Sequence, residues 1–105
     1  MRPVRTALED EVLRWPGVRA KTMFGCPSYQ ANGILFAFLV SKGVVITRLD
    51  DASRSRLSAE LHAAPFKAGQ RTVRAYLEVP VERGEDIGPV LPFVRKSYEG
   101  ALEIE

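Results

Sequence analysis

The sequence has very few of the side chains that reactive sites use most often. It contains one cysteine, Cys26, and one histidine, His62, among 105 residues. A single cysteine cannot close an internal disulfide, which excludes the disulfide framework of small secreted domains. A Cys/His pair also supplies fewer ligands than a zinc site takes. We therefore expect no metal, no cofactor and no disulfide-stabilised fold.

Long hydrophobic runs are also missing. The longest nearly apolar stretch, residues 34–40, is far shorter than the roughly 20 residues that a membrane-spanning helix needs. The first residues, from Met1 to Arg5, lead into a charged amphipathic segment and lack the apolar core of a signal peptide. These two absences predict a cytoplasmic protein that does not associate with membranes.

The chain has little net charge, +2 at pH 7, which is too small to indicate nucleic-acid binding by itself. Its length is close to the commonest size of one domain, and 46% of its residues are hydrophobic. A domain of this size can bury more than half of the surface that its unfolded chain exposes. We expect residues 1–105 to form a single domain with its own core.

The first part of the chain predicts a helix followed by a group of strands. Apolar residues recur every three or four positions over residues 4–15, and Pro16-Gly17 then ends the helical pattern. Strands are expected at residues 19–24, 28–31, 34–40 and 44–49. Asn32-Gly33 is typical of a two-residue hairpin turn because both residues tolerate positive φ. Residues 34–40 are apolar at both parities, which predicts a strand covered on both faces by helices, a second sheet or a partner chain.

The second part repeats this order with fewer strands. Asp50-Asp51 offers N-cap oxygens for a helix over residues 52–63. Residues 72–79 alternate between apolar and polar, which predicts a strand that pairs with a short strand around Phe66. A last helix is expected at least over residues 93–101. The predicted fold class is α+β: a two-layer sandwich in which helices pack on one face of a mostly antiparallel sheet.

None of the reactive residue types forms a recognisable catalytic constellation. Cys26 and His62 fall on different predicted elements, so a small half-buried cysteine is favoured over a thiol nucleophile. The carboxylates, from Glu9-Asp10-Glu11 to Glu85-Asp86, have no spacing that predicts a shared site, and solvated surface is the favoured interpretation. We expect a protein that is not an enzyme. A small-molecule binder or thiol enzyme near Cys26 is kept as an alternative.

A second alternative comes from basic and aromatic residues on the polar face of strand 72–79. Arg71 and Arg74 lie beside Tyr76, and Tyr29 could extend the same face. A basic sheet face with aromatic side chains can bind single-stranded nucleic acid, although a solvated sheet face is the commoner case. These four residues form the interaction surface that the sequence predicts.

An ordered set of short motifs resembles a known family. The motifs are together similar to the TfoX N-terminal domain. They are Met23-Phe24-Gly25 after the first helix, the Asn32-Gly33 hairpin, Phe36-Ala37, Pro65-Phe66, the strand that ends at Pro80 and a last helix around Tyr98. The resemblance runs from about Val12 to Leu102. For Met23-Phe24-Gly25 itself a structural role is favoured, with Met and Phe in the core and Gly at a bend.

The resemblance implies a bacterial cytoplasmic protein with the order helix, three strands, helix, two strands, helix. Longer members of that family, called TfoX or Sxy, regulate competence for DNA uptake and act with the cyclic-AMP receptor protein. They carry a helical C-terminal domain that this sequence is expected to lack. The leading hypothesis is therefore a non-catalytic interaction module that is accessory to transcription or competence regulation. Its expected partner is another protein or, in a homodimer, a second copy of the chain.

Overall fold

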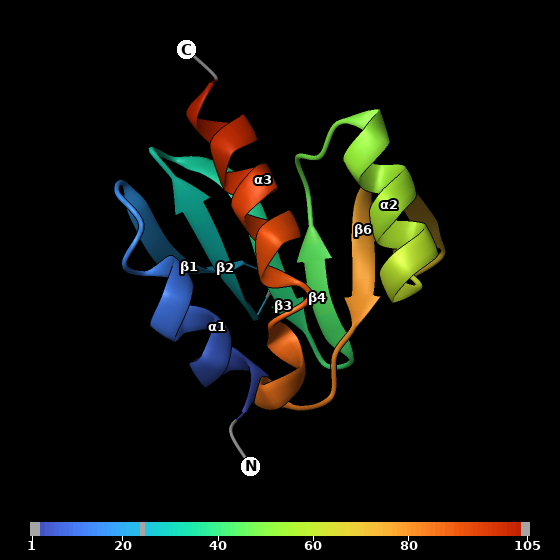
Figure 1. Cartoon of the computed structure of the whole chain (residues 1–105), viewed down its shortest axis with the longest axis horizontal. Coiled ribbons are helices and arrows are strands. Elements are labelled where there is room, and N and C mark those ends of the chain that lie inside the picture. The colour runs from blue at the N-terminus through green and yellow to red at the C-terminus, as the bar shows by residue number, and fades with distance from the viewer. Residues whose placement is uncertain (1–2, 24, 104–105) are drawn as a thin grey trace.

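The computed structural model describes residues 3–23 and 25–103 and confirms the predicted α+β class. Helices lie over one face of a six-stranded antiparallel sheet (Figure 1). The elements, in chain order, are α1 (Val4–Val12), β1 (Val18–Met23), β2 (Cys26–Ala31), β3 (Ile34–Val40), β4 (Gly43–Ile46), α2 (Asp51–Leu61), β5 (Ala64–Ala68), β6 (Arg71–Pro80), the short 3-10 helix η1 (Gly84–Ile87) and α3 (Leu91–Leu102). Four strands precede α2, where the family resemblance implied three.

The strands follow one another across the sheet in the order β1-β2-β3-β4-β6-β5. The predicted Asn32-Gly33 hairpin is confirmed, because both residues have positive φ, 51° and 84°. β4 ends at Ile46, before the predicted end at residue 49. The Thr47 N–H still donates to the Phe36 carbonyl of β3, but the backbone then turns toward α3. The N–H of Arg48 donates to Ser97 Oγ on α3, and the Ser97 hydroxyl donates in turn to the Phe36 carbonyl.

A β-bulge in β3 explains why this strand is apolar at both its odd and its even positions. Tyr29 of β2 pairs with Ala37, whereas Gln30 pairs with Leu35, so Phe36 is an extra residue. The extra residue shifts the alternation of side chains by one position. Phe36 and Ala37 therefore both belong to the core beneath the helices, together with Leu39. After the shift, Phe38 lies on the opposite face of the sheet.

The helix layer covers the centre of the sheet with α3, and α1 lies beside it (Figure 1). Tyr98 of α3 packs edge-on against Phe36 and donates its hydroxyl hydrogen bond to the Pro16 carbonyl. Trp15 packs against Tyr98, and the guanidinium of Arg95 lies over both rings. This group of aromatic residues joins the end of the first helical segment to α3 and the sheet.

The β5–β6 hairpin covers part of the second face of the sheet. Phe38 is 4% exposed, and its ring packs edge-on against Phe66 of β5 and Tyr76 of β6. The register between these two strands is irregular, since Pro65 pairs with Leu77 but Phe66 pairs with Val73. The expectation that strand 34–40 is covered on both faces is therefore met within the chain itself, by helices on one side and by this hairpin on the other.

The ends of the helices follow the capping signals of the sequence. Asp50 caps α2 by accepting a hydrogen bond from the Ser53 N–H at 2.7 Å. α1 ends at Val12 instead of residue 15, because Arg14 and Trp15 bond to carbonyls three residues back and form a tighter turn ahead of Pro16. α3 includes the predicted residues 93–101 and begins at Leu91, with Pro92 in its first turn.

Candidate functional site

β1 forms one edge of the sheet and pairs, within the part of the chain that the structure describes, with β2 alone. Its register runs from Val18 opposite Ala31 to Met23 opposite Cys26, and Asn32 N–H donates to the Gly17 carbonyl. Hydrogen-bonded and non-hydrogen-bonded pairs alternate along an antiparallel ladder. The backbone N–H and C=O groups of Ala20 and Thr22 therefore point away from β2, toward solvent.

The two faces of β1 differ in charge. Ala20 lies opposite Tyr29, whose hydroxyl reaches Glu9 on α1, so Ala20 and Thr22 are on the helix side of the sheet. By the same alternation Arg19 and Lys21 are on the other face. Both are exposed, and neither makes an ion pair within residues 3–23 and 25–103. β1 therefore presents outward-pointing backbone groups beside two cations that have no ion-pair partner in the described part of the chain.

Met23 and Gly25 of the Met23-Phe24-Gly25 motif lie at the end of β1 and just before β2. Met23 pairs with Cys26, and Gly25 has φ of 78°, a conformation that favours glycine. Met23 is half-buried and is not part of the core cluster, so the expectation that it fills the core is wrong. The alternation along β1 places Met23 on the same face as Lys21, away from the helices. Phe24 lies outside the described residues.

The structure separates the predicted interaction surface into two parts. Arg71 and Arg74 are exposed on β6, and Tyr76 is half-buried against Phe38. The guanidinium of Arg54 on α2 donates to the carbonyls of Arg74 and Ala75, which ties this strand to the helix. These residues remain together on the β5–β6 hairpin.

Tyr29 does not belong to the predicted interaction surface. It is fully buried on the helix side of β2 and donates a hydrogen bond to Glu9 Oε2 at 2.7 Å. Burial, and then the bond to the carboxylate, raises the pKa of its hydroxyl. The hydrogen bond to Glu9 on α1 ties Tyr29 to the helix side of the sheet, and this contact between residues 20 positions apart was not visible in the sequence. Glu9 is correspondingly half-buried instead of being the solvated residue that we expected.

The described strands carry a net positive charge and the described helices a net negative charge, a difference that the overall net charge of +2 does not show. Among the described elements, Glu78 is the acidic residue of the strands, whereas the basic residues of the strands are Arg19, Lys21, Lys67, Arg71 and Arg74. The helices carry eight acidic residues against five basic ones, Arg5, Arg54, Arg56, Arg95 and Lys96. The acidic residues are Glu9, Asp10, Glu11, Asp51, Glu60, Glu85, Asp86 and Glu99. The sheet is therefore the basic side of the domain.

Cys26 is half-buried at the start of β2 and lines a hollow of about 470 Å³. Arg5, Leu39 and Ser41 are among the other residues of that hollow. His62 does not line it, so the structure does not bring the cysteine and the histidine together.

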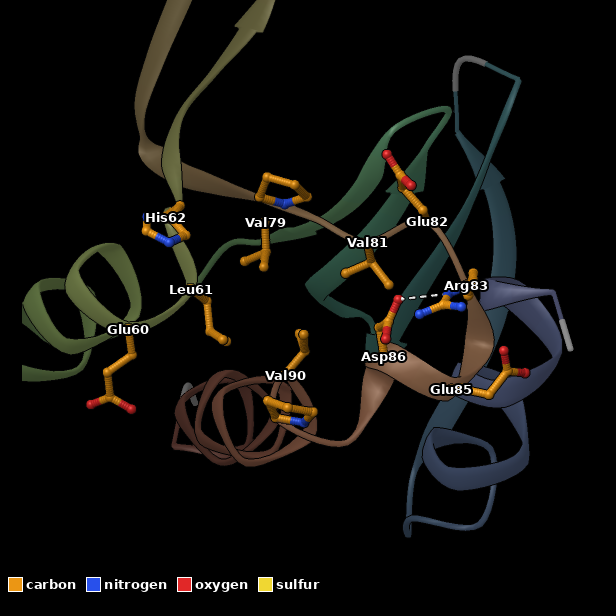
Figure 2. A pocket seen from close by; sticks show the side chains of 12 residues that line it. Glu60, Leu61, His62, Val79, Val81, Glu82, Arg83, Glu85, Asp86 and Val90 are labelled. Atoms are coloured by element: carbon orange, nitrogen blue, oxygen red, sulfur yellow. Dashed lines mark hydrogen bonds and ion pairs between the residues drawn. The ribbon is translucent and has the colours of Figure 1, made fainter. Parts of the chain in front are cut away.

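His62 caps the end of α2 in a left-handed conformation, with φ of 58°, and lines another hollow of about 540 Å³. Figure 2 shows Val79, Val81 and Val90 grouped at the apolar floor of this hollow. Arg83 and Asp86 at its rim form an ion pair of 3.4 Å, while the side chains of Glu60 and Glu85 point away from the floor (Figure 2). The polar groups around this hollow do not converge on one point.

Residues 3–23 and 25–103 contain no group of three or more His, Cys, Asp or Glu side chains placed to hold a metal ion. Over the same residues, every helix is too short or too polar to cross a bilayer.

The fold and its most distinctive surface define a small α+β domain with an open, basic sheet edge and helices that cover the other side of the sheet. The chain belongs to the TfoX N-terminal domain family, whose model matches residues 10–101. Comparison with the curated proteins and with the solved structures gives no match. The match extends from α1 to the last turn of α3, so it includes all six strands.

Proposed function

We propose that this chain is a non-catalytic protein-interaction module of the TfoX N-terminal type, accessory to transcription or competence regulation in the bacterial cytoplasm. The observation that carries the proposal is the free edge of β1. An exposed sheet edge offers backbone donors and acceptors to an extended segment of another protein, which can add to the sheet as a further strand. Family membership supports the regulatory setting.

The two edges of the sheet are unequal, and this favours β1 as the binding edge. β5, at the opposite edge, contains Pro65, which has no N–H to offer, and the strand is followed closely by the Gly69 turn. β1 contains no proline, and its four central residues are exposed on both faces. Its position is fixed by regular pairing along the whole of β2. A partner strand would therefore meet a rigid, pre-formed template.

The substitution Ala20→Pro tests this proposal. It removes an N–H that points to solvent, so the pairing of β1 with β2 is retained while a further strand loses a donor and meets the proline ring. The matched control Ala20→Val keeps the N–H and the strand geometry. In a deletion strain of the source organism, we expect wild type and Ala20→Val to restore the transcript profile and Ala20→Pro to fail, although all three chains fold equally well by circular dichroism. Full restoration by Ala20→Pro would overturn the proposal.

The charge of the β5–β6 hairpin favours nucleic-acid binding as a second candidate function. Lys67, Arg71 and Arg74 lie on this hairpin, and no acidic residue occurs between His62 and Leu77. Such a basic ribbon predicts salt-dependent binding of DNA. We expect Arg71→Glu with Arg74→Glu to abolish any retardation of single- or double-stranded DNA at low salt. Arg56→Glu with Lys96→Glu, which makes the same change in net charge on the helix layer, should preserve it. An equal loss of DNA retardation in both double variants would indicate non-specific electrostatic attraction.

A further inference from the structure

We propose that β1 binds an extended segment with acidic side chains at alternating positions. This inference rests on the proposed function and names the partner class: an acidic strand that adds to the sheet beside β1. The hydrogen bonds would come from the backbone of Ala20 and Thr22, and the choice of partner from the charges of Arg19 and Lys21.

The backbone part of the argument follows from the register of β1 on β2. Val18, Ala20 and Thr22 lie opposite Ala31, Tyr29 and Pro27, and these are the non-hydrogen-bonded pairs of the β1–β2 ladder. Val18 N–H is already used by the Trp15 carbonyl. The N–H and C=O groups of Ala20 and Thr22 are therefore the groups at which an added strand can form its ladder, together with the Val18 carbonyl.

The charge part follows from the same alternation. Relative to an added strand, Arg19 and Lys21 occupy non-hydrogen-bonded pairs, in which facing side chains come closest. Both side chains lie on one face and have no ion-pair partner among the described residues. A partner with carboxylates two residues apart would place one carboxylate beside each cation. The positions between them would lie next to Ala20 and Thr22, whose small side chains leave room for β-branched residues.

The same charges disfavour a second copy of this chain as the occupant. In a two-fold antiparallel pair with Ala20 opposite Ala20, Arg19 of each copy faces Lys21 of the other. With Ala20 opposite Thr22, the two Lys21 side chains face each other. Like charges directly opposite one another destabilise a strand pair. The edge is therefore complementary to an acidic strand and repels its own copy.

Titration of the ¹⁵N-labelled full-length chain with synthetic peptides tests the inference. The probe is a capped seven-residue peptide in which valine alternates with glutamate, and its control has lysine in place of each glutamate. At an ionic strength of about 10 mM, where screening is weak, we expect the glutamate peptide to shift the amide signals of Ala20 and Thr22 and to protect those amides from hydrogen exchange. The lysine peptide places like charges opposite Arg19 and Lys21, so it should bind about tenfold more weakly than the glutamate peptide.

Three variants separate strand addition from simple charge attraction. Arg19→Glu with Lys21→Glu should reverse the preference, so that the lysine peptide binds better. Ala20→Pro should lower the affinity for the glutamate peptide about tenfold, which corresponds to the loss of one or two backbone hydrogen bonds. Ala20→Val should keep this affinity within about threefold of the wild-type value. Equal binding to wild type and Ala20→Pro, or shifts centred on the β5–β6 hairpin, would show polyanion attraction without strand addition and would overturn the inference.

Failure of this inference can be distinguished from failure of the proposed function. If Ala20→Pro fails to restore the transcript profile but wild type does not prefer the glutamate peptide, the binding edge is retained and the acidic partner is wrong. If Ala20→Pro restores the profile while the peptide binds β1 as expected, the edge binds acidic strands and the regulatory role is wrong.

Discussion

Tyr29 and Glu9 connect the sheet to α1 through one hydrogen bond. The Tyr29 hydroxyl donates to Glu9 Oε2 at 2.7 Å, and the same oxygen accepts from Arg5 Nε at 3.0 Å. Because the tyrosine is fully buried and its partner is a carboxylate, the folded state strongly disfavours the ionised phenolate. The single contact therefore makes stability depend on pH on the alkaline side.

We predict that the free energy of unfolding falls as the pH rises above about 10, the usual pKa of tyrosine. In that range the unfolded state loses the Tyr29 proton while the folded state keeps it, so the folded state binds more protons and stability decreases with pH. Tyr29→Phe should be about 1 kcal/mol less stable at neutral pH and should show a shallower decrease between about pH 9 and pH 11. Urea unfolding of both chains across this range measures the two slopes. Identical slopes would contradict the prediction.

Ser97 is a buried polar residue that completes the hydrogen bonding of the β3 bulge. Its hydroxyl donates to the Phe36 carbonyl at 2.6 Å and accepts from the Arg48 N–H at 3.0 Å. The Phe36 carbonyl also accepts from the Thr47 N–H. In the sequence, Ser97 stands between Lys96 and Tyr98, and this position gave no indication of its role.

We predict that Ser97→Ala destabilises the chain by about 1–3 kcal/mol, because it removes two hydrogen bonds, the buried one to the Phe36 carbonyl and the partly buried one from the Arg48 N–H. Ser97→Cys, which has a similar shape and a weaker donor, should lose less. Thermal and urea unfolding give the comparison. Ser58→Ala on the exposed side of α2 is the control and should be close to neutral. An unchanged free energy of unfolding in Ser97→Ala would mean that water or a shifted backbone supplies the hydrogen bonds of the bulge.

At the scale of elements, the β5–β6 hairpin protects the face of the sheet that the helices leave open. Phe66 is the contact that carries this protection, since its ring packs against Phe38 at a centroid distance of 5.2 Å. We predict that Phe66→Ala lowers the free energy of unfolding by about 2 kcal/mol, less than the roughly 3–5 kcal/mol of aromatic truncations in a core, because Phe66 is only half-buried.

Hydrogen exchange can locate the effect of Phe66→Ala. The amides of residues 64–73 should exchange faster than in wild type, while those of β2 and β3 should change only by the loss of global stability. Lys67→Ala, at the adjacent exposed position of the same strand, is the control and should leave the hairpin amides protected. Uniform acceleration throughout the sheet would contradict a local role for Phe66.

Most elements of this fold were predictable because their signals are local. Asn32-Gly33 and the Asp50 cap each act through neighbouring residues, whereas the prolines near the start of α3 did not fix where that helix begins. The bulge at Phe36 and the packing of the β5–β6 hairpin on Phe38 depend on contacts between residues far apart in the sequence. The pattern of residues 34–40 therefore indicated two buried faces of the strand but did not show which elements cover them. Tyr29 was assigned to the wrong surface for the same reason.

The candidate site was only partly predictable. The strand that became β1 was expected from its residues, but its position at the edge is a property of the whole sheet. The alternation of Arg19 and Lys21 with small residues was the available signal, because charged side chains are typical of exposed edge strands.

At the scale of the whole molecule, the charges of β1 predict how the chain associates with itself. Wild type should not dimerise through this edge. Lys21→Glu should promote a two-fold pair with Ala20 opposite Ala20, because Arg19 of each copy then faces a carboxylate of the other. Sedimentation equilibrium at low salt should show a shift toward the dimer in Lys21→Glu, and high salt should reverse it.

The double variant Arg19→Glu with Lys21→Glu is the control for this experiment. It again places like charges opposite one another and should behave as wild type does. A wild-type dimer that Ala20→Pro disrupts would contradict the predicted repulsion.

The strands carry a net positive charge and the helices a net negative charge, and this difference gives the domain an electric dipole directed across its two layers. A domain with such a dipole turns in the field of a negatively charged surface before contact, with its sheet side leading. Productive encounters are thereby selected by orientation, and their rate should fall steeply with ionic strength even though the net charge is only +2. The opposite net charges of the two layers would thus affect the rate of recognition, because they favour encounters in which the sheet side faces the partner.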